Sequence, residues 1–182
     1  GRSIGLYPGV RWRLGNRAEL RLSPRISINR RAAQYIDELS ANGAPVYVFG
    51  ELDQVTTSLT TRLSYTFTPD LSLQLYAEPF ISAGDYGSYM QVADPRAAQF
   101  NDRFAPFPGE IDNPDFNYRA LRSNAVLRWE YRPGSAIFLV WSQGREAFGE
   151  YGDYAFDRDT DRLFGSKATN VLLIKATYWL GL

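Results

Sequence analysis

The chain has 182 residues, a formal net charge of zero, no cysteine and no histidine. Zero net charge argues against a nucleic-acid partner bound through bulk charge. The missing cysteines exclude disulfides and thiolate chemistry, and the missing histidines exclude Ser-His-Asp and Cys-His catalysis and the usual histidine-containing zinc sites.

Apolar and polar residues alternate along most of the chain, which is the pattern of β-strands with two unlike faces. In AELRLSPRISINR, for example, one row is apolar and the opposite row carries Glu19 and Arg21. The pattern predicts seven strands and no helix, with the strands at 4–14, 18–31, 46–67, 71–91, 120–132, 136–145 and 168–182. Pro8, Pro24 and Pro79 fall in the apolar row and each removes a ladder donor, so we expect a bulge or local distortion there.

The predicted connections alternate between short and long. Tight turns are expected at GNR (15–17), TPD (68–70) and RPGS (132–135), and longer loops around 32–45, 92–119 and 146–167. In an up-and-down meander every second connection falls at the same end, so the turns share one end and the loops share the other. The C-terminus then lies at the turn end. Short turns opposite long loops are typical of bacterial outer-membrane barrels.

The alternation alone does not decide which row faces outward. In a small soluble barrel the apolar row points inward, whereas in a membrane barrel it meets lipid and the polar row lines the lumen. Long strands, mixed charges in the polar row and unequal loops favour the membrane barrel. Aromatic residues near the turns, such as Trp12, Trp129 and Tyr178, fit a lipid-interface girdle, although strands favour aromatic residues in any setting. The candidate lumen-facing residues are Arg11, Arg13, Arg21, Arg25, Arg62, Glu78, Arg122, Arg128, Glu130 and Lys175.

Seven strands cannot close such a barrel by themselves. The first and last strands would run in the same direction, whereas bacterial single-chain barrels contain even, antiparallel sets, and unpaired edges are not tolerated in lipid. The chain also opens without a methionine or a signal peptide. We therefore expect residues 1–182 to form one β-barrel segment that pairs with strands from upstream in the same polypeptide or from another chain.

Two specific motifs carry a family resemblance, TFTPDLSLQLYAEPF (66–80) and NAVLRWEYRPGS (124–135). Around them, residues 46–182 resemble the C-terminal part of the domain of unknown function 5916 proteins of Gram-negative bacteria. Residues 1–45 match in their alternation pattern more than in their individual residues. The resemblance implies a signal peptide and a carbohydrate-binding family 9-like domain upstream, followed by a long outer-membrane barrel. It supplies no activity, so no catalytic residue is carried over.

Three features of the sequence are candidates for ligand binding or catalysis. DRDTD (157–161) spaces its aspartates like a calcium loop, but Arg162 and Ala168 stand where the EF-hand needs Gly and Glu, so no metal site is predicted. The segment 100–119 is aromatic and acidic, and either binds sugars or packs on its own aromatics. Glu78 and Glu130 could form a glycosidase pair, but pairing with arginines is the simpler interpretation. The candidate surface-loop ligand residues are Phe104, Phe107, Asp112, Phe116 and Tyr118.

The sequence therefore predicts an all-β fold, an antiparallel up-and-down section of a transmembrane barrel in the outer membrane of a Gram-negative bacterium, with a periplasmic C-terminus. The first functional hypothesis is a transport or surface-binding barrel, with glycans among the candidate ligands, and no enzyme activity or cofactor is expected. A non-conducting barrel that anchors an upstream domain or partner complex stays open, as does a soluble β-barrel that binds an apolar ligand. The expected partners are outer-membrane lipid, the missing strands and the barrel-assembly machinery, which would recognise the C-terminal strand.

Overall fold

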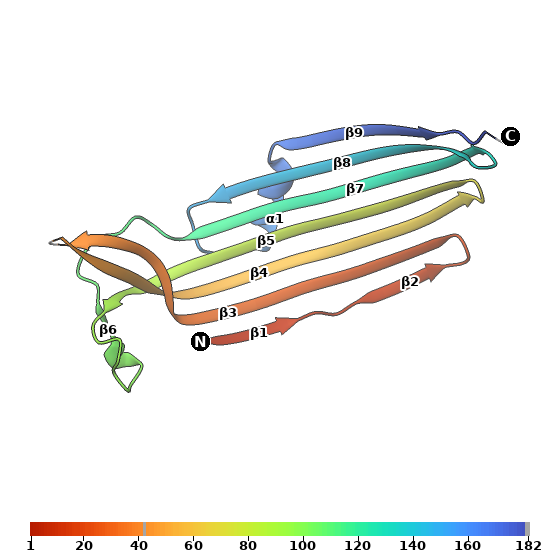
Figure 1. Cartoon of the computed structure of the whole chain (residues 1–182). Coiled ribbons are helices and arrows are strands. Elements are labelled where there is room, and N and C mark those ends of the chain that lie inside the picture. Colours follow the sequence, from red (N-terminus) through yellow and green to blue (C-terminus); the bar gives the residue numbers. More distant parts are fainter. Residues whose placement is uncertain (42, 181–182) are drawn as a thin grey trace.

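The computed structural model describes residues 1–41 and 43–180, and these residues form one antiparallel sheet of long strands (Figure 1). The strands are β1 (Arg2–Leu6), β2 (Val10–Leu14), β3 (Ala18–Ala41), β4 (Ala44–Thr68), β5 (Leu71–Val92), β6 (Phe104–Pro106), β7 (Phe116–Arg132), β8 (Ser135–Gly149) and β9 (Ala168–Thr177). Two short helices complete the described chain, the 3-10 helix η1 (Asn101–Arg103) and α1 (Phe156–Gly165).

The order of strands across the sheet follows the order along the chain. It runs β1-β3-β4-β5-β7-β8-β9, with β2 continuing the position of β1 beside β3, and with short β6 added to β5. Every pair is antiparallel. The prediction of an all-β antiparallel meander is therefore confirmed. The described strands do not close into a ring, because β1 and β2 form one edge and β9 forms the other.

The three predicted turns lie at one end of the sheet together with the C-terminal end of β9 (Figure 1). We call this the turn end and the opposite end the loop end. At the turn end Leu14 pairs with Ala18 and Arg132 pairs with Ser135. Gly134 has a φ of 76°, a left-handed conformation that glycine adopts without steric cost, which explains the glycine in the RPGS turn.

The loop predicted at 32–45 is wrong, because β3 and β4 continue through it until Ala41 pairs with Ala44. The register shifts twice on the way, between Arg31 and Gln34 and between Tyr35 and Asp37. Each irregularity moves the following side chains to the other face, so the simple alternation is lost although the strands continue. Strand β7 likewise begins at 116, four residues before its predicted start.

The prediction that the chain has no helix is also wrong. Helix α1 occupies ten residues of the segment expected to be a loop, and it packs beside β7 and β8. Its N-cap, Ala155, makes no side-chain capping bond, so the usual sequence signal for a helix start is missing. None of the helices in the described part of the chain is long and apolar enough to cross a membrane.

The local distortion expected at the prolines is present, and it is a gap in the pairing rather than a bulge. Leu6 pairs with Ile26 and Val10 pairs with Leu22, so residues 7–9 face residues 23–25 one to one. Pro8 therefore stands opposite Pro24, and neither residue has an N–H to donate. The edge strand splits into β1 and β2 for this reason.

The two faces of the sheet differ in character, as the alternation predicts. We call them the apolar face and the polar face. One cross-strand row of the apolar face contains Trp12, Leu20, Leu63, Leu75, Ala125, Trp141 and Leu172, and the adjacent row of the polar face contains Arg11, Arg21, Arg62, Tyr76, Asn124, Ser142 and Val171. Helix α1 lies over the apolar face toward the loop end and leaves the turn end of that face bare.

Strand β9 ends at Thr177, earlier than the predicted boundary of 182. The next residues contact the neighbouring turn: Arg132 Nη1 donates to Tyr178 Oη at 2.7 Å and the Trp179 N–H donates to Ser135 Oγ at 3.0 Å. The C-terminal strand that the assembly machinery is expected to recognise is predicted to end at Leu182, which lies outside the described residues.

Candidate functional site on the polar face

All ten predicted lumen-facing residues lie on the polar face. The register places them in successive rows. From the turn end, these rows hold Glu130, then Arg128 and Lys175, then Arg13 with Glu19, then Arg11, Arg21 and Arg62, then Glu78 and Arg122, and finally Arg25. Because side chains two residues apart share a face, this common placement follows from the pairing itself.

Glu19 is the centre of a cluster of three arginines on strands β2 and β3. Its Oε1 lies 2.5 Å from Arg21 Nε and 3.7 Å from Arg11 Nε, and its Oε2 lies 3.2 Å from Arg13 Nε. The Glu19 side chain is only 25% exposed, whereas the three arginines are 46–70% exposed. One carboxylate is thus shared by three guanidinium groups, so the net charge of the cluster is positive.

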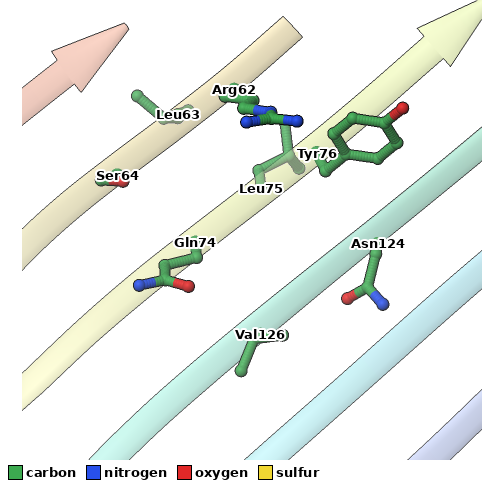
Figure 2. Close-up of a pocket in the computed structure, with 8 residues that line it drawn as sticks. All are labelled: Arg62, Leu63, Ser64, Gln74, Leu75, Tyr76, Asn124 and Val126. Atoms are coloured by element: carbon green, nitrogen blue, oxygen red, sulfur yellow. The ribbon is translucent and has the colours of Figure 1, made fainter. Parts of the chain in front are cut away.

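A hollow of about 490 Å³ lies beside this cluster, across β4, β5 and β7 (Figure 2). Arg62 Cζ lies 5.6 Å from the centroid of the Tyr76 ring, which is within the range of a cation–π contact. The Tyr76 hydroxyl donates to Glu78 on the same strand. Figure 2 shows Gln74 and Asn124 lining the same hollow, so amide, hydroxyl and guanidinium groups all face it.

A second hollow of about 360 Å³ adjoins the first and shares Arg62 and Tyr76 with it. It is lined by Arg21, Ser23, Arg25, Thr60, Arg62, Tyr76 and Glu78. Three of these seven residues are arginines, and Glu78 is the one carboxylate among them. Leu63, Leu75 and Val126 also line the first hollow. We call the two adjoining hollows near the middle of the face the polar site.

Glu78 and Glu130 are too far apart to act as a glycosidase pair. Glu78 stands opposite Arg122 of β7, and Glu130 lies eight residues farther along that strand. At roughly 3.3 Å per residue the separation is about 26 Å, whereas glycosidase carboxylates lie about 5–10 Å apart. Glu130 instead forms an ion pair with Arg128 and accepts the Gly134 N–H at 3.1 Å, so it stabilises the turn.

A family model described as a domain of unknown function, DUF5916, matches residues 2–182. The chain belongs to this family. The match extends the resemblance of residues 46–182 to the N-terminal strands. No curated protein and no solved structure matches the chain.

The five surface-loop candidates of the DUF5916 chain do not gather into one site. Phe104 packs against Phe49 and Phe100, with ring centroids 5.3 Å apart in both pairs. Phe116 and Tyr118 lie in β7, where Phe116 contacts Tyr86, and Tyr118 packs on Phe80 and donates to Glu146. Phe107 donates its backbone N–H to the Tyr89 carbonyl, and Asp112 is exposed. This arrangement resembles an aromatic-packed connection more than a shared binding surface.

A buried polar cluster beneath α1 was not predicted from the sequence. The Asp159 carboxylate is fully buried and accepts hydrogen bonds from Asn117 Nδ2 at 3.0 Å, the Ala155 N–H at 2.9 Å and Arg158 Nε at 2.9 Å. Arg119 Nη1 lies 3.8 Å from Asp159 Oδ1. Both Asn117 and Arg119 fall in the segment 92–119, which is predicted to be a loop. They join the row of Leu121 because β7 begins at Phe116, and counting back by twos from Leu121 is the signal that could have found them.

The pKa of Asp159 reflects these contacts. Burial alone would raise the pKa of the carboxyl group, but the hydrogen bonds from Arg158, Ala155 and Asn117 outweigh it and hold the pKa below its usual value of 3.8. The three aspartates of DRDTD lie on a helix rather than a loop, with Asp157 and Asp161 exposed and Asp159 buried. Their side chains therefore do not converge as calcium ligands would.

An apolar hollow of about 460 Å³ lies between α1 and strands β3, β4 and β5, beside the place where the helix packs on β7 and β8. Leu59 and Pro79 line it from the strands, and Phe156 and Phe164 line it from the helix. Both phenylalanines are more than half exposed, whereas Leu163 between them is fully buried. The hollow lies on the opposite side of the sheet from the polar site.

Proposed function

We propose that the chain is a section of an integral outer-membrane β-barrel whose apolar face meets lipid and whose polar face lines the lumen. The observation that carries the proposal is the bare turn end of the apolar face. Trp129 and Leu139 lie on strands with neighbours on both sides, yet they are 50% and 43% exposed. An exposed apolar surface of this extent needs a partner, and a bilayer is the partner that suits alternating strands.

The height of the bare surface supports the same proposal. On β5, the apolar row runs from Leu71 at the turn to Pro79 beneath the hollow at α1, a stretch of nine residues. A tilted transmembrane strand needs about 9–11 residues to cross a bilayer. Beyond Pro79, α1 and the segment before it lie over the apolar face around β5, where Ile81 and Ala83 are buried. Apolar residues nearer the N-terminal edge stay 45–63% exposed, namely Ile4, Leu6, Ile26 and Ile28. The part beneath α1 would then lie outside the hydrocarbon on the loop side.

The aromatic residues at the turn end fit a lipid-interface girdle in this proposal. Tyr65 packs edge-on against Phe67, with centroids 4.7 Å apart, and Trp129 packs against Tyr131 at 6.1 Å. Rings of this kind have an apolar body and, for Tyr and Trp, a polar tip, which suits the boundary between lipid and water.

The two open edges require further strands if the sheet lies in lipid. Strand β9 pairs with β8 on one side, and β1 and β2 pair with β3, while the outer sides of these strands have no partner among the described residues. Unsatisfied backbone groups in hydrocarbon cost several kcal/mol each. We propose that strands of the same polypeptide or of a second chain pair with both edges and close the barrel.

The polar site supports transport or surface binding over a purely structural role. Its two adjoining hollows are lined by guanidinium, amide and hydroxyl groups, with one face of the Tyr76 ring covered by Arg62. Any membrane barrel has a polar interior, but two adjoining hollows, one of them lined by three arginines, also offer a place for a ligand. Conductance of the natural polypeptide in planar bilayers separates these roles, since an anchor would show no channel at any voltage.

Adjacent cysteine substitutions provide the direct test, because the chain has no natural cysteine. Leu73 lies on the apolar face and Gln74 on the polar face, one residue apart on β5. In outer-membrane vesicles, a membrane-impermeant maleimide should label Leu73→Cys poorly and Gln74→Cys readily. Labelling after detergent solubilisation serves as the control for folding and for thiol reactivity.

The competing function is a soluble β-barrel that binds an apolar ligand, and the position of α1 favours it. A helix packed over an apolar sheet face, with an apolar hollow of about 460 Å³ beneath it, is also how a soluble protein can enclose such a ligand. In that case the protein would be monodisperse without detergent, and Leu73→Cys would be shielded by protein even after the membrane is dissolved. That pair of results would contradict the membrane proposal.

A further inference from the structure

We propose that the polar site binds an oxyanion, a solute that carries carboxylate, phosphate or sulfate groups. This inference rests on the proposed function for its setting, because it assigns a substrate class to the lumen-facing site. It is carried by the arrangement of Arg21, Arg25 and Arg62 around the second hollow.

The first observation is a row of like charges. Arg11, Arg21 and Arg62 stand directly opposite one another on β2, β3 and β4. Directly opposed residues have Cβ atoms about 5 Å apart, and like charges at that distance destabilise the sheet. A row of three arginines therefore has an electrostatic cost, which water reduces and nearby negative charge offsets further.

The second observation is that protein carboxylates offset this cost only in part. Glu19 pairs with Arg11 and Arg21, and it also serves Arg13. Glu78 accepts a hydrogen bond from Tyr76 and forms no ion pair with an arginine in the described part of the chain. Arg25 and Arg62 face the same hollow, and within the described ranges neither has a carboxylate within ion-pair distance.

The third observation is the geometry of the remaining donors. Ser23 and Thr60 line the hollow between the arginines and offer hydroxyl donors beside the guanidinium groups. Guanidinium groups bind the planar or tetrahedral oxygens of an oxyanion through paired hydrogen bonds, and hydroxyl groups complete such a shell. A neutral sugar would leave the arginine charges uncompensated, so we assign the site to an anion.

The test measures anion binding by the natural polypeptide purified in detergent. Pyrophosphate and citrate serve as probes because they present phosphate and carboxylate oxygens respectively, and neutral maltotriose serves as the comparison. We expect both anions to raise the thermal unfolding temperature and maltotriose to leave it unchanged. Arg62→Gln should weaken anion binding about tenfold, the usual effect of losing one hydrogen bond between charged groups.

Arg30→Gln is the matched control. Arg30 is an exposed arginine of β3 that pairs with Asp53 on the other face of the sheet, with Nε 3.2 Å from Oδ1. The Arg30→Gln variant should bind both probes as tightly as the natural protein does. Equal weakening in both variants would overturn the site, as would an absence of anion binding by the natural protein at millimolar concentration.

The membrane proposal and the anion site fail in different ways. If Leu73→Cys is labelled and Gln74→Cys is shielded, the lumen assignment is wrong whatever the anion measurement shows. If the labelling follows expectation and neither anion binds, the barrel stands and the substrate class is wrong. Where the barrel conducts, anion selectivity in a salt gradient should fall in Arg62→Gln and stay unchanged in Arg30→Gln.

Discussion

Arg119 of β7 and Asp159 of α1 form a buried ion pair between the sheet and the helix. Arg119 Nη1 lies 3.8 Å from Asp159 Oδ1, and both side chains are at least 95% buried. An unpaired charge buried to this extent is costly, because it has lost its hydration. The pair therefore fixes α1 to the apolar face at one position.

Replacing Asp159 with alanine should detach α1. The change removes the carboxylate beside buried Arg119, which keeps the Tyr151 hydroxyl as an acceptor but loses its counter-charge, and it removes the acceptor for the Ala155 N–H at the start of the helix. The expected cost is about 3 kcal/mol, or on the order of 100-fold in the population of the opened segment. Faster trypsin cleavage at Arg158 and Lys167 measures the opening. Asp157→Ala, at an exposed position of the same helix, should leave the cleavage rate close to that of the natural protein.

The docking of α1 should depend on pH in the acid range. The pKa of Asp159 is lowered in the folded state, so its contribution to stability is present above the unfolded pKa, near 3.8. The contribution is lost as the pH falls through the lower, folded pKa. Urea unfolding of the helix, followed by circular dichroism between pH 6 and pH 2, should show this loss. Asp159→Asn should flatten the curve, and an equally steep curve in that variant would assign the dependence to other groups.

Gly152→Val should displace the segment that leads into α1. A Cβ at Gly152 would lie 2.4 Å from Asp85 Cα and 2.6 Å from the Gly84 carbonyl oxygen, and backbone atoms cannot move aside cheaply. Overpacking of this kind costs about 1–3 kcal/mol. Amide hydrogen exchange should quicken across α1. Gly165→Ala is the control, because a Cβ there meets no atom within 4 Å; comparable effects in both variants would contradict the close approach.

Pro8→Thr should extend the edge strand. Residues 7–9 already face 23–25 in register, so a residue with an N–H can donate across the gap without any shift. We expect slower amide exchange at residues 7–10 and a gain of about 1 kcal/mol for the added backbone bond. Asn16→Thr, in the turn nearby, should not slow exchange at these residues. No change at 7–10 in the Pro8 variant would mean that Pro24 alone keeps the strands apart.

Much of the sheet could be predicted because alternation and turn chemistry are local signals. The rows of β5 and β7 are regular from the turn onward, and their turns use Pro, Asp and Gly at the expected places. Pairing direction and the shared face of Arg62 and Glu78 then follow from counting along the strands. The same counting correctly places the end of the C-terminal strand at the turn end of the sheet (Figure 1).

The missed elements depend on contacts distant in sequence. Helix α1 lacks a capping side chain, and its position is fixed by Arg119 and Asn117, which lie far away along the chain. The continuation of β3 and β4 passes through two register shifts, which erase the alternation although the ladder continues. Neither feature leaves a periodic pattern in the segment where it occurs.

The proline row also has a mechanical consequence. Pro8, Pro24 and Pro79 lie on one line across the sheet with Leu59 between them, and pairing is interrupted between Leu59 and Pro79 as it is between the two N-terminal prolines. Pairing is continuous between Pro24 and Leu59 and between Pro79 and Leu121, so the row contains two separate gaps. A sheet resists bending through its ladder of hydrogen bonds, so we expect it to yield first at these two places, one at the N-terminal edge and one between β4 and β5.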